Sequence, residues 1–108
     1  MKIGNIDDAK EWFEVLQTGE RSQTAMMTLK PDDATGADAE AHEKSDQVLL
    51  MLAGELEGEV GEERPKLKKG DVIIIPAGVK HRFVNHGKTD GVTFNVYSPP
   101  AYPVGTKG

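Results

Sequence analysis

The sequence predicts one all-β domain, built as a sandwich or barrel of short strands. The chain has 108 residues, which is the usual size of a single domain. Short apolar runs recur at close intervals and are separated by turn residues, a pattern typical of sandwiches and barrels. The longest apolar run covers residues 48–53, far too few to cross a membrane as a helix.

Composition narrows the functional classes. The net charge of −5 at pH 7 argues against non-specific binding to nucleic acid, which requires a basic surface. The chain has no cysteine, so any transition metal must be held by nitrogen and oxygen ligands. The first residues contain no apolar run of signal-peptide length. We therefore expect a cytoplasmic protein that contacts neither nucleic acid nor a membrane.

The first element has two interpretations. Apolar residues within 9–16 fall at helical spacing, after two aspartates that could cap a helix. Residues 11–17 also include Trp, Phe and Val, which favour a strand. Residues 22–30 predict a strand that ends at Pro31, and residues 32–38 predict a loop rich in Asp, Ala and Gly.

Turn residues divide the remainder of the chain into further strands. We expect these strands at residues 48–52, 56–60, 64–67, 72–75, 81–85 and 92–97. The β-branched run before Pro76 stops there, because proline cannot continue a hydrogen-bonded ladder. Three prolines fall within residues 98–103, so residues 98–108 are expected to form an extended tail beyond a barrel core of about residues 11–97.

Two places carry residues suited to metal chemistry. Glu40 and His42 are two apart in an extended stretch and therefore point to the same face. Gln47 begins the next strand and joins them if the intervening residues make a tight loop. His81 follows a proline–glycine corner at the start of a later strand. A carboxylate, imidazoles and an amide oxygen suit a divalent metal, although each residue taken singly also fits an ordinary surface role.

The same residues carry a resemblance to the cupin family. Residues 70–85 match the second cupin motif at every defining position: Gly, five residues, Pro, any residue, Gly, two residues, His, three residues, Asn. The first motif has His, any residue, His, three or four residues, Glu, six residues, Gly. Its spacing holds here up to Gly54, with Glu40 in place of the first His and Gln47 in place of the Glu. This departure indicates either a decayed site or a cupin subgroup that supplies oxygen ligands.

The resemblance extends over nearly the whole chain. It implies a cupin double-stranded β-helix, or jelly-roll barrel, as a single domain over residues 1–108, and it favours a strand at residues 11–17. It also implies homodimers formed through the N-terminal strands and one sheet face. Its implied cofactor is one divalent transition metal (Fe, Mn, Zn or Ni) with the ligands Glu40, His42, Gln47 and His81. An empty polar pocket made by the same four residues is the alternative.

Alternation along the strands predicts which other side chains join the site. If Gln47 and His81 point inward, so do the residues two and four positions along the same strands. The last strand contributes according to its register, which the sequence leaves open. The predicted pocket-lining residues are Leu49, Met51, Phe83, Phe94 and Tyr97. Asn85 is expected to satisfy backbone groups at a turn, and His86 to be exposed.

Three functional classes remain. The first is a metal-dependent enzyme that acts on a small organic molecule by oxygenation, isomerisation or lyase chemistry. The second is a non-catalytic module that binds or senses a metal or small molecule, and the third is a structural dimer. The fold does not decide among them. A general acid or base near the metal would favour the enzyme, and the candidates are Tyr97, Tyr102 and Glu43.

Overall fold

The computed structural model describes all 108 residues. Apart from one turn of 3-10 helix, η1 (Ile6–Asp8), every regular element is a strand. The strands are β1 (Phe13–Thr18), β2 (Gln23–Leu29), β3 (Asp46–Ala53), β4 (Glu55–Val60), β5 (Lys66–Lys68), β6 (Val72–Ile75), β7 (His81–Val84) and β8 (Gly91–Ser98). The all-β prediction is confirmed, and the ambiguous first segment is a strand. No helix is long and apolar enough to span a membrane.

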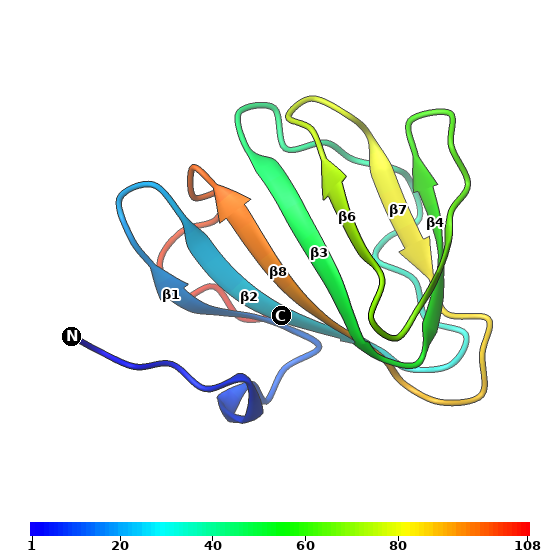
Figure 1. Cartoon of the computed structure of the whole chain (residues 1–108), viewed down its shortest axis with the longest axis horizontal. Helices are drawn as coiled ribbons and strands as arrows, with labels where there is room; N and C mark the ends of the chain where they lie inside the picture. Colours follow the sequence, from blue (N-terminus) through cyan, green and yellow to red (C-terminus); the bar gives the residue numbers. More distant parts are fainter.

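The strands form two antiparallel sheets whose curved arrangement is seen in Figure 1. The larger sheet has the order β1-β2-β8-β3-β6 and the smaller has the order β5-β4-β7. The last strand, β8, therefore lies between β2 and β3 at the centre of the larger sheet. This order is that of a jelly-roll barrel, as the sequence predicted.

The hydrophobic core draws residues from both sheets. Its members are Phe13, Val15, Ala25, Met27, Leu29, Leu49, Met51, Leu56, Leu67, Ile75, Phe83 and Tyr97. Gly58 of β4 lies opposite Phe83 of β7. A Cβ at Gly58 would come within 2.9 Å of the Phe83 ring, so glycine is what allows that ring to pack here. Leu49, Met51 and Phe83 are at most 1% exposed and lie inside the barrel.

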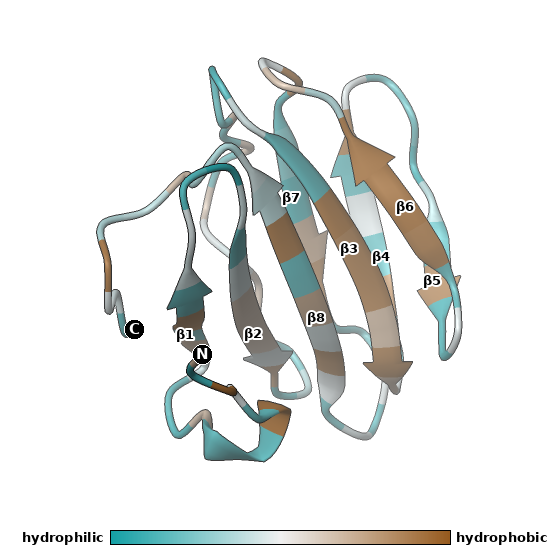
Figure 2. Ribbon diagram, turned by 60° about the vertical axis from the view of Figure 1, so that its left-hand side comes forward, coloured by the Kyte–Doolittle hydropathy of each residue, from teal (hydrophilic) through white to brown (hydrophobic).

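Strand β8 turns its polar side inward. Thr93, Asn95 and Tyr97 are buried, whereas the intervening residues are half-buried on the other face. This alternation is visible as bands along β8 in Figure 2. Phe94 pairs with Leu50 of β3 on the outer face. Its predicted place in the pocket is therefore wrong: positions 94 and 97 are an odd number of residues apart, so only one of them can face inward.

A tight turn after β6 delivers β7. Val79 N donates a hydrogen bond to Pro76 O at 3.1 Å, and Gly78, the third residue of the turn, has a φ of 82°. A positive φ at this position favours glycine, because other residues place a Cβ against the backbone. The motif glycine is thus a backbone requirement that sets the position of His81.

The C-terminal segment, residues 99–108, folds back onto the barrel. Val15 N donates to Thr106 O at 2.8 Å, and Glu14 and Lys107 form a β-bridge. The Tyr102 ring packs 4.7 Å from the ring of Phe13. In the segment predicted to be an extended tail, residues 106–108 therefore lie beside β1 at the edge of the larger sheet.

Candidate metal and ligand site

The residues around 40 and 81 meet through backbone pairing. Glu40 and His81 exchange two backbone hydrogen bonds, at 2.9 and 3.0 Å, and Gly78 N donates to His42 O at 2.9 Å. Glu40 and His81 therefore project to the same side, and His42 projects beside them because it lies two residues further on. The centroids of the two imidazole rings are 5.2 Å apart. The structure thus brings together two segments that are far apart in the sequence.

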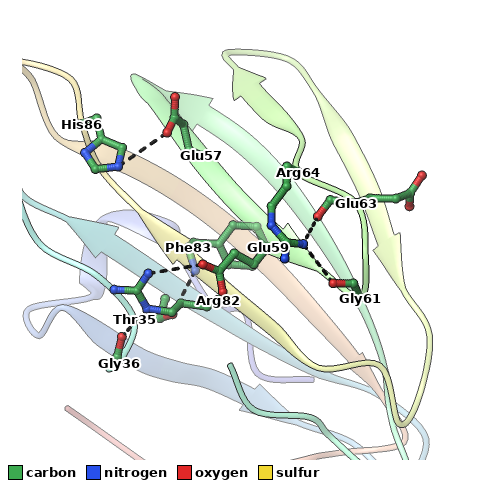
Figure 3. A network of polar contacts seen from close by, with 10 residues as sticks. All are labelled: Thr35, Gly36, Glu57, Glu59, Gly61, Glu63, Arg64, Arg82, Phe83 and His86. Carbon is green, nitrogen blue, oxygen red and sulfur yellow. Dashed lines mark hydrogen bonds and ion pairs between the residues drawn. The ribbon is translucent and has the colours of Figure 1, made fainter. Parts of the chain in front are cut away.

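Side chains fasten the loop that carries Glu40 and His42. Arg82 Nε donates to Gly36 O at 2.6 Å, and Phe83 N donates to Thr35 Oγ1 at 3.1 Å. Figure 3 shows these contacts together with the ion pair between Arg82 and Glu59, which measures 3.7 Å. The loop is held along the free edge of β7, and the orientation of the site depends on that attachment.

Gln47 supplies the third side of the site. It is 4% exposed and is paired with Tyr97 of β8 in the larger sheet. Its Nε2 donates to Asn95 Oδ1 at 3.0 Å. Its Oε1 is buried and has no hydrogen-bond partner. Gln47 therefore presents a free acceptor on the inner wall opposite Tyr97, whose ring lies 5.0 Å from that of His42.

Two tyrosines complete the polar mouth of the barrel. The Tyr102 ring lies 5.3 Å from His42 and 5.2 Å from Tyr97. Gln23 fixes the backbone of Tyr102: its Nε2 donates to Tyr102 O at 2.8 Å, and its Oε1 accepts from Tyr102 N at 3.0 Å. Tyr102 therefore belongs to the site although it comes from the C-terminal segment.

The electrostatics keep the imidazole of His42 neutral. Burial, and then the neighbouring His81, lower the pKa of His42, while Glu40 acts in the opposite direction. A neutral imidazole is the form that binds a metal. His81 has its tautomer fixed, because Nδ1 contacts Val79 O at 3.1 Å and a carbonyl can only accept. In the neutral ring Nδ1 carries the proton, and Nε2 keeps the lone pair.

The tyrosines remain protonated at neutral pH. Burial raises the pKa of both Tyr97 and Tyr102 above the ordinary value for tyrosine. Protonated phenols donate hydrogen bonds and do not act as bases near pH 7. Of the predicted acid–base candidates, these two face the imidazoles, whereas Glu43 is exposed.

A cavity of about 240 Å³ adjoins the site. Its walls are Trp12, Phe13, Met27, Thr35, Asp38, Glu40, His81, Tyr97, Tyr102, Thr106 and Gly108. Aromatic rings make up much of this wall, and Glu40 and His81 supply polar groups. Leu49, Met51 and Phe83 lie in the packed core, and none of them reaches this cavity.

The four predicted metal ligands differ in their burial and in their neighbours. The rings of His42 and His81 lie beside each other, Gln47 has a buried oxygen without a partner, and Glu40 is exposed at the cavity. No group of three or more His, Asp or Glu side chains is gathered for a metal ion. The four-ligand set therefore stays a prediction.

The other two motif-related predictions concern β7 and the loop after it. Asn85 is fully buried, donates to Leu29 O and Thr89 O at 2.8 Å each, and accepts from Gly87 N at 2.8 Å. Its predicted role in satisfying backbone groups is confirmed. His86 is exposed as predicted and faces Glu57.

Sequence reasoning missed three polar residues of the interior: Gln23, Thr93 and Asn95. The signal for the latter two was present, because polar and apolar residues alternate strictly from Val92 to Tyr97. An alternating strand has one face inside, and here the polar face is the inner one.

Comparison with known proteins now decides the family. The family model described as "Cupin domain" matches residues 25–97. The chain belongs to the cupin family. The matched part of this cupin runs from β2 to β8 and includes all four predicted ligands.

Individual relatives resemble this cupin in sequence and in structure. The cupin is 32% identical over 95 residues to uncharacterized protein L612 of Acanthamoeba polyphaga mimivirus, which covers 84% of this chain and 58% of that protein. It thus spans little more than half of that relative. The crystal structure of BH2720 from Bacillus halodurans superposes with a TM-score of 0.87 at 26% identity, covering 98% of this chain and 86% of that one. A predicted oxalate decarboxylase from Thermotoga maritima gives a TM-score of 0.67 at 26% identity, covering 73% and 67%.

Proposed function

We propose that this cupin binds one divalent transition metal through His42, His81, Gln47 and Glu40, and acts on a small organic molecule held in the adjoining cavity. One observation carries the proposal: the oxygen of Gln47 is buried and unpartnered, and Gln47 pairs with Tyr97, whose ring contacts one of two adjacent imidazoles. A buried acceptor left unpaired costs about 1–3 kcal/mol, and a cation would remove that cost.

The chemistry of these four side chains supports such a metal. The donor set would be two imidazoles, one carboxylate and one amide oxygen, which suits Fe, Mn, Zn or Ni. His42 is neutral and His81 has a free Nε2, so both are ready to donate a lone pair. When bound, the metal would supply Lewis acidity toward an oxygen of the substrate.

The chain's own residues have separate roles in this proposal. The aromatic walls of the cavity exclude water from the apolar part of the ligand. Tyr97 and Tyr102 stay protonated and donate hydrogen bonds, with Tyr102 the proposed proton donor because its ring faces both the cavity and His42. Likeness to a predicted oxalate decarboxylase favours decarboxylation of a small organic acid among the possible reactions.

Metal analysis by plasma mass spectrometry of the untagged protein tests the proposal. Near-stoichiometric metal is expected in the wild type and should be lost in a His42→Ala, His81→Ala double variant. His86→Ala is the control, since His86 is exposed outside the site, and it should retain the metal. Metal absent from the wild type even after reconstitution would instead favour the alternative, a non-catalytic small-molecule binding module.

We also propose that the chain forms a homodimer through the outer face of the larger sheet. On that face Val72 and Ile74 of β6 are 60% and 65% exposed, and β3 and β8 add half-buried apolar residues. β6 is apolar along its length in Figure 2. The apolar side chains of this face can pack against the same side chains of a second copy about a two-fold axis.

Light scattering after gel filtration tests the dimer. Ile74→Lys should convert it to a monomer, and Val104→Lys, at a more exposed apolar residue of the C-terminal segment, should not. A wild type that is monomeric at high concentration contradicts this proposal and leaves the metal site untouched.

A further inference from the structure

A chain of hydrogen bonds runs through the interior from Gln47 to the backbone of β2. Gln47 Nε2 donates to Asn95 Oδ1 at 3.0 Å, and Asn95 Nδ2 donates to Thr93 Oγ1 at 2.9 Å. Thr93 Oγ1 in turn donates to Met27 O at 3.3 Å. The three side chains are between 0 and 4% exposed, so this relay is closed to solvent.

The end of the relay fixes its direction. A backbone carbonyl can only accept, so the single hydroxyl proton of Thr93 goes to Met27 O. The oxygen of Thr93 then accepts from the amide of Asn95, whose own carbonyl accepts from Gln47. Gln47 Oε1 is the only end left over, and it has no partner. The opposite orientation would set the lone pairs of Thr93 Oγ1 and Met27 O against each other.

We propose that Thr93 and Asn95 are positioning residues, which hold Gln47 so that its Oε1 is a fixed acceptor toward the site. Gln47 therefore receives a cation or a hydrogen-bond donor at that point, and it disfavours a carbonyl or carboxylate oxygen. The inference rests on the proposed function for the identity of the occupant, a divalent cation. The orientation itself rests only on the relay.

The relay is also matched to glutamine rather than glutamate at position 47. A carboxylate there has no proton to donate, so it would face Asn95 Oδ1 as one acceptor against another. Asn95 would have to reverse, which would take the Thr93 hydroxyl away from Met27 O. The departure from the first cupin motif at position 47 therefore has a structural counterpart at positions 93 and 95.

Titration of the metal-free protein with Zn²⁺, with the affinity measured by calorimetry, tests the positioning role. Thr93→Val should weaken Zn²⁺ binding by about tenfold or more, in the range known for residues that orient metal ligands. Thr28→Val removes a hydroxyl from the outer face of β2, where it makes no side-chain hydrogen bond, and should leave the affinity unchanged. Thr93→Ser keeps the hydroxyl and should bind as the wild type does.

A double-mutant cycle separates positioning from a general loss of structure. In a Gln47→Ala background, Thr93→Val should have no further effect, because the ligand that the relay orients is gone. An equal loss of affinity in both backgrounds would overturn the proposal.

If the wild type binds no Zn²⁺, the proposed function fails and the relay is judged in the metal-free protein by nuclear magnetic resonance. The side-chain amide protons of Gln47 should exchange slowly with solvent and have a chemical shift displaced by the hydrogen bond to Asn95. Both properties should be lost in Thr93→Val and kept in Thr93→Ser. Identical Gln47 signals in all three proteins would overturn the relay itself.

Discussion

The two ends of the barrel interior differ in polarity: the closed end, around Leu56, is apolar, and the open end, around His42, is polar. At the closed end, Leu56 packs so tightly on Gly91 that a Cβ at Gly91 would come within 2.6 Å of the Leu56 side chain. At the open end, the rings of His42, Tyr97 and Tyr102 stand about a polar space, and a buried amide oxygen has no partner. Leu56 is apolar and 2% exposed, whereas His42 is ionisable and half-buried.

This difference teaches where stability and function should separate. Apolar contacts at the closed end contribute to the free energy of unfolding in proportion to the area they bury. An unpaired polar atom at the open end lowers the free energy of unfolding. That loss is regained only when a ligand or cation binds and pairs with the atom. Substitutions at the two ends should therefore change different measurements.

The largest effect is expected at Leu56. Leu56→Ala should lower the free energy of unfolding by about 2–5 kcal/mol, because it leaves a cavity in the packed end. Urea denaturation of the metal-free protein measures this change. Val104→Ala, at a residue 81% exposed, is the control and should leave the midpoint where it is. A Leu56 variant as stable as the wild type would contradict the idea that the closed end contributes more to stability than the open end does.

The next effect concerns Asn85, near the closed end. Asn85→Ala removes three hydrogen bonds to backbone groups, and two backbone carbonyls thereby lose their side-chain donor. We expect a loss of about 1–3 kcal/mol in the free energy of unfolding, measured in urea. His86→Ala, in the next residue, should have little effect. Equal stability of the two variants would show that Asn85 is not needed for the turn.

These two predictions rest on features that sequence alone could give. Every expected strand is present with small changes at its ends, because turn residues and β-branched runs act locally. The resemblance to the two cupin motifs also implied that Glu40 and His81 share one site, and the glycine-containing turn fixes where His81 falls.

The parts of the site that the sequence did not predict depend on strand register and on long-range packing. Phe94 was predicted to line the pocket together with Tyr97 because the register of the last strand was open, yet β8 turns Asn95 and Tyr97 inward. Tyr102 reaches the site only because Gln23 holds its backbone across 79 residues of sequence. No local pattern records either fact, because both depend on which strands become neighbours.

A smaller effect is expected from acidity at the open end. Because the pKa of His42 is lowered by burial and then by His81, the unfolded chain takes up the proton more readily than the folded one. The free energy of unfolding of the metal-free protein should therefore hold above pH 6.5, the ordinary pKa of histidine, and fall as the pH drops below it. The groups facing His42 are His81, Glu40, Tyr97 and Tyr102.

Denaturation in urea at a series of pH values checks this dependence. His42→Gln should flatten it, and His86→Gln, in the exposed histidine, should keep the wild-type profile. The same fall in both variants would mean that other groups cause it.

The smallest effect is expected from Tyr102→Phe. The ring contacts with Phe13 and His42 are kept, so the free energy of unfolding should change by less than about 1 kcal/mol. Turnover of a substrate, once one is found, should fall, because the proposed proton donor is gone. Thermal unfolding checks the first statement. Tyr102→Ala is the contrasting variant, and it should be clearly less stable because the ring contacts are lost.

The attachment of the C-terminal segment has an evolutionary consequence. One wall of the cavity is contributed by residues that follow the last strand and are held by Gln23, by contact with Phe13 and by a few backbone hydrogen bonds to β1. Those residues lie outside all eight strands. New ligand preferences can therefore arise in this scaffold by drift or recombination at its C-terminus, without a change in the barrel that supports them.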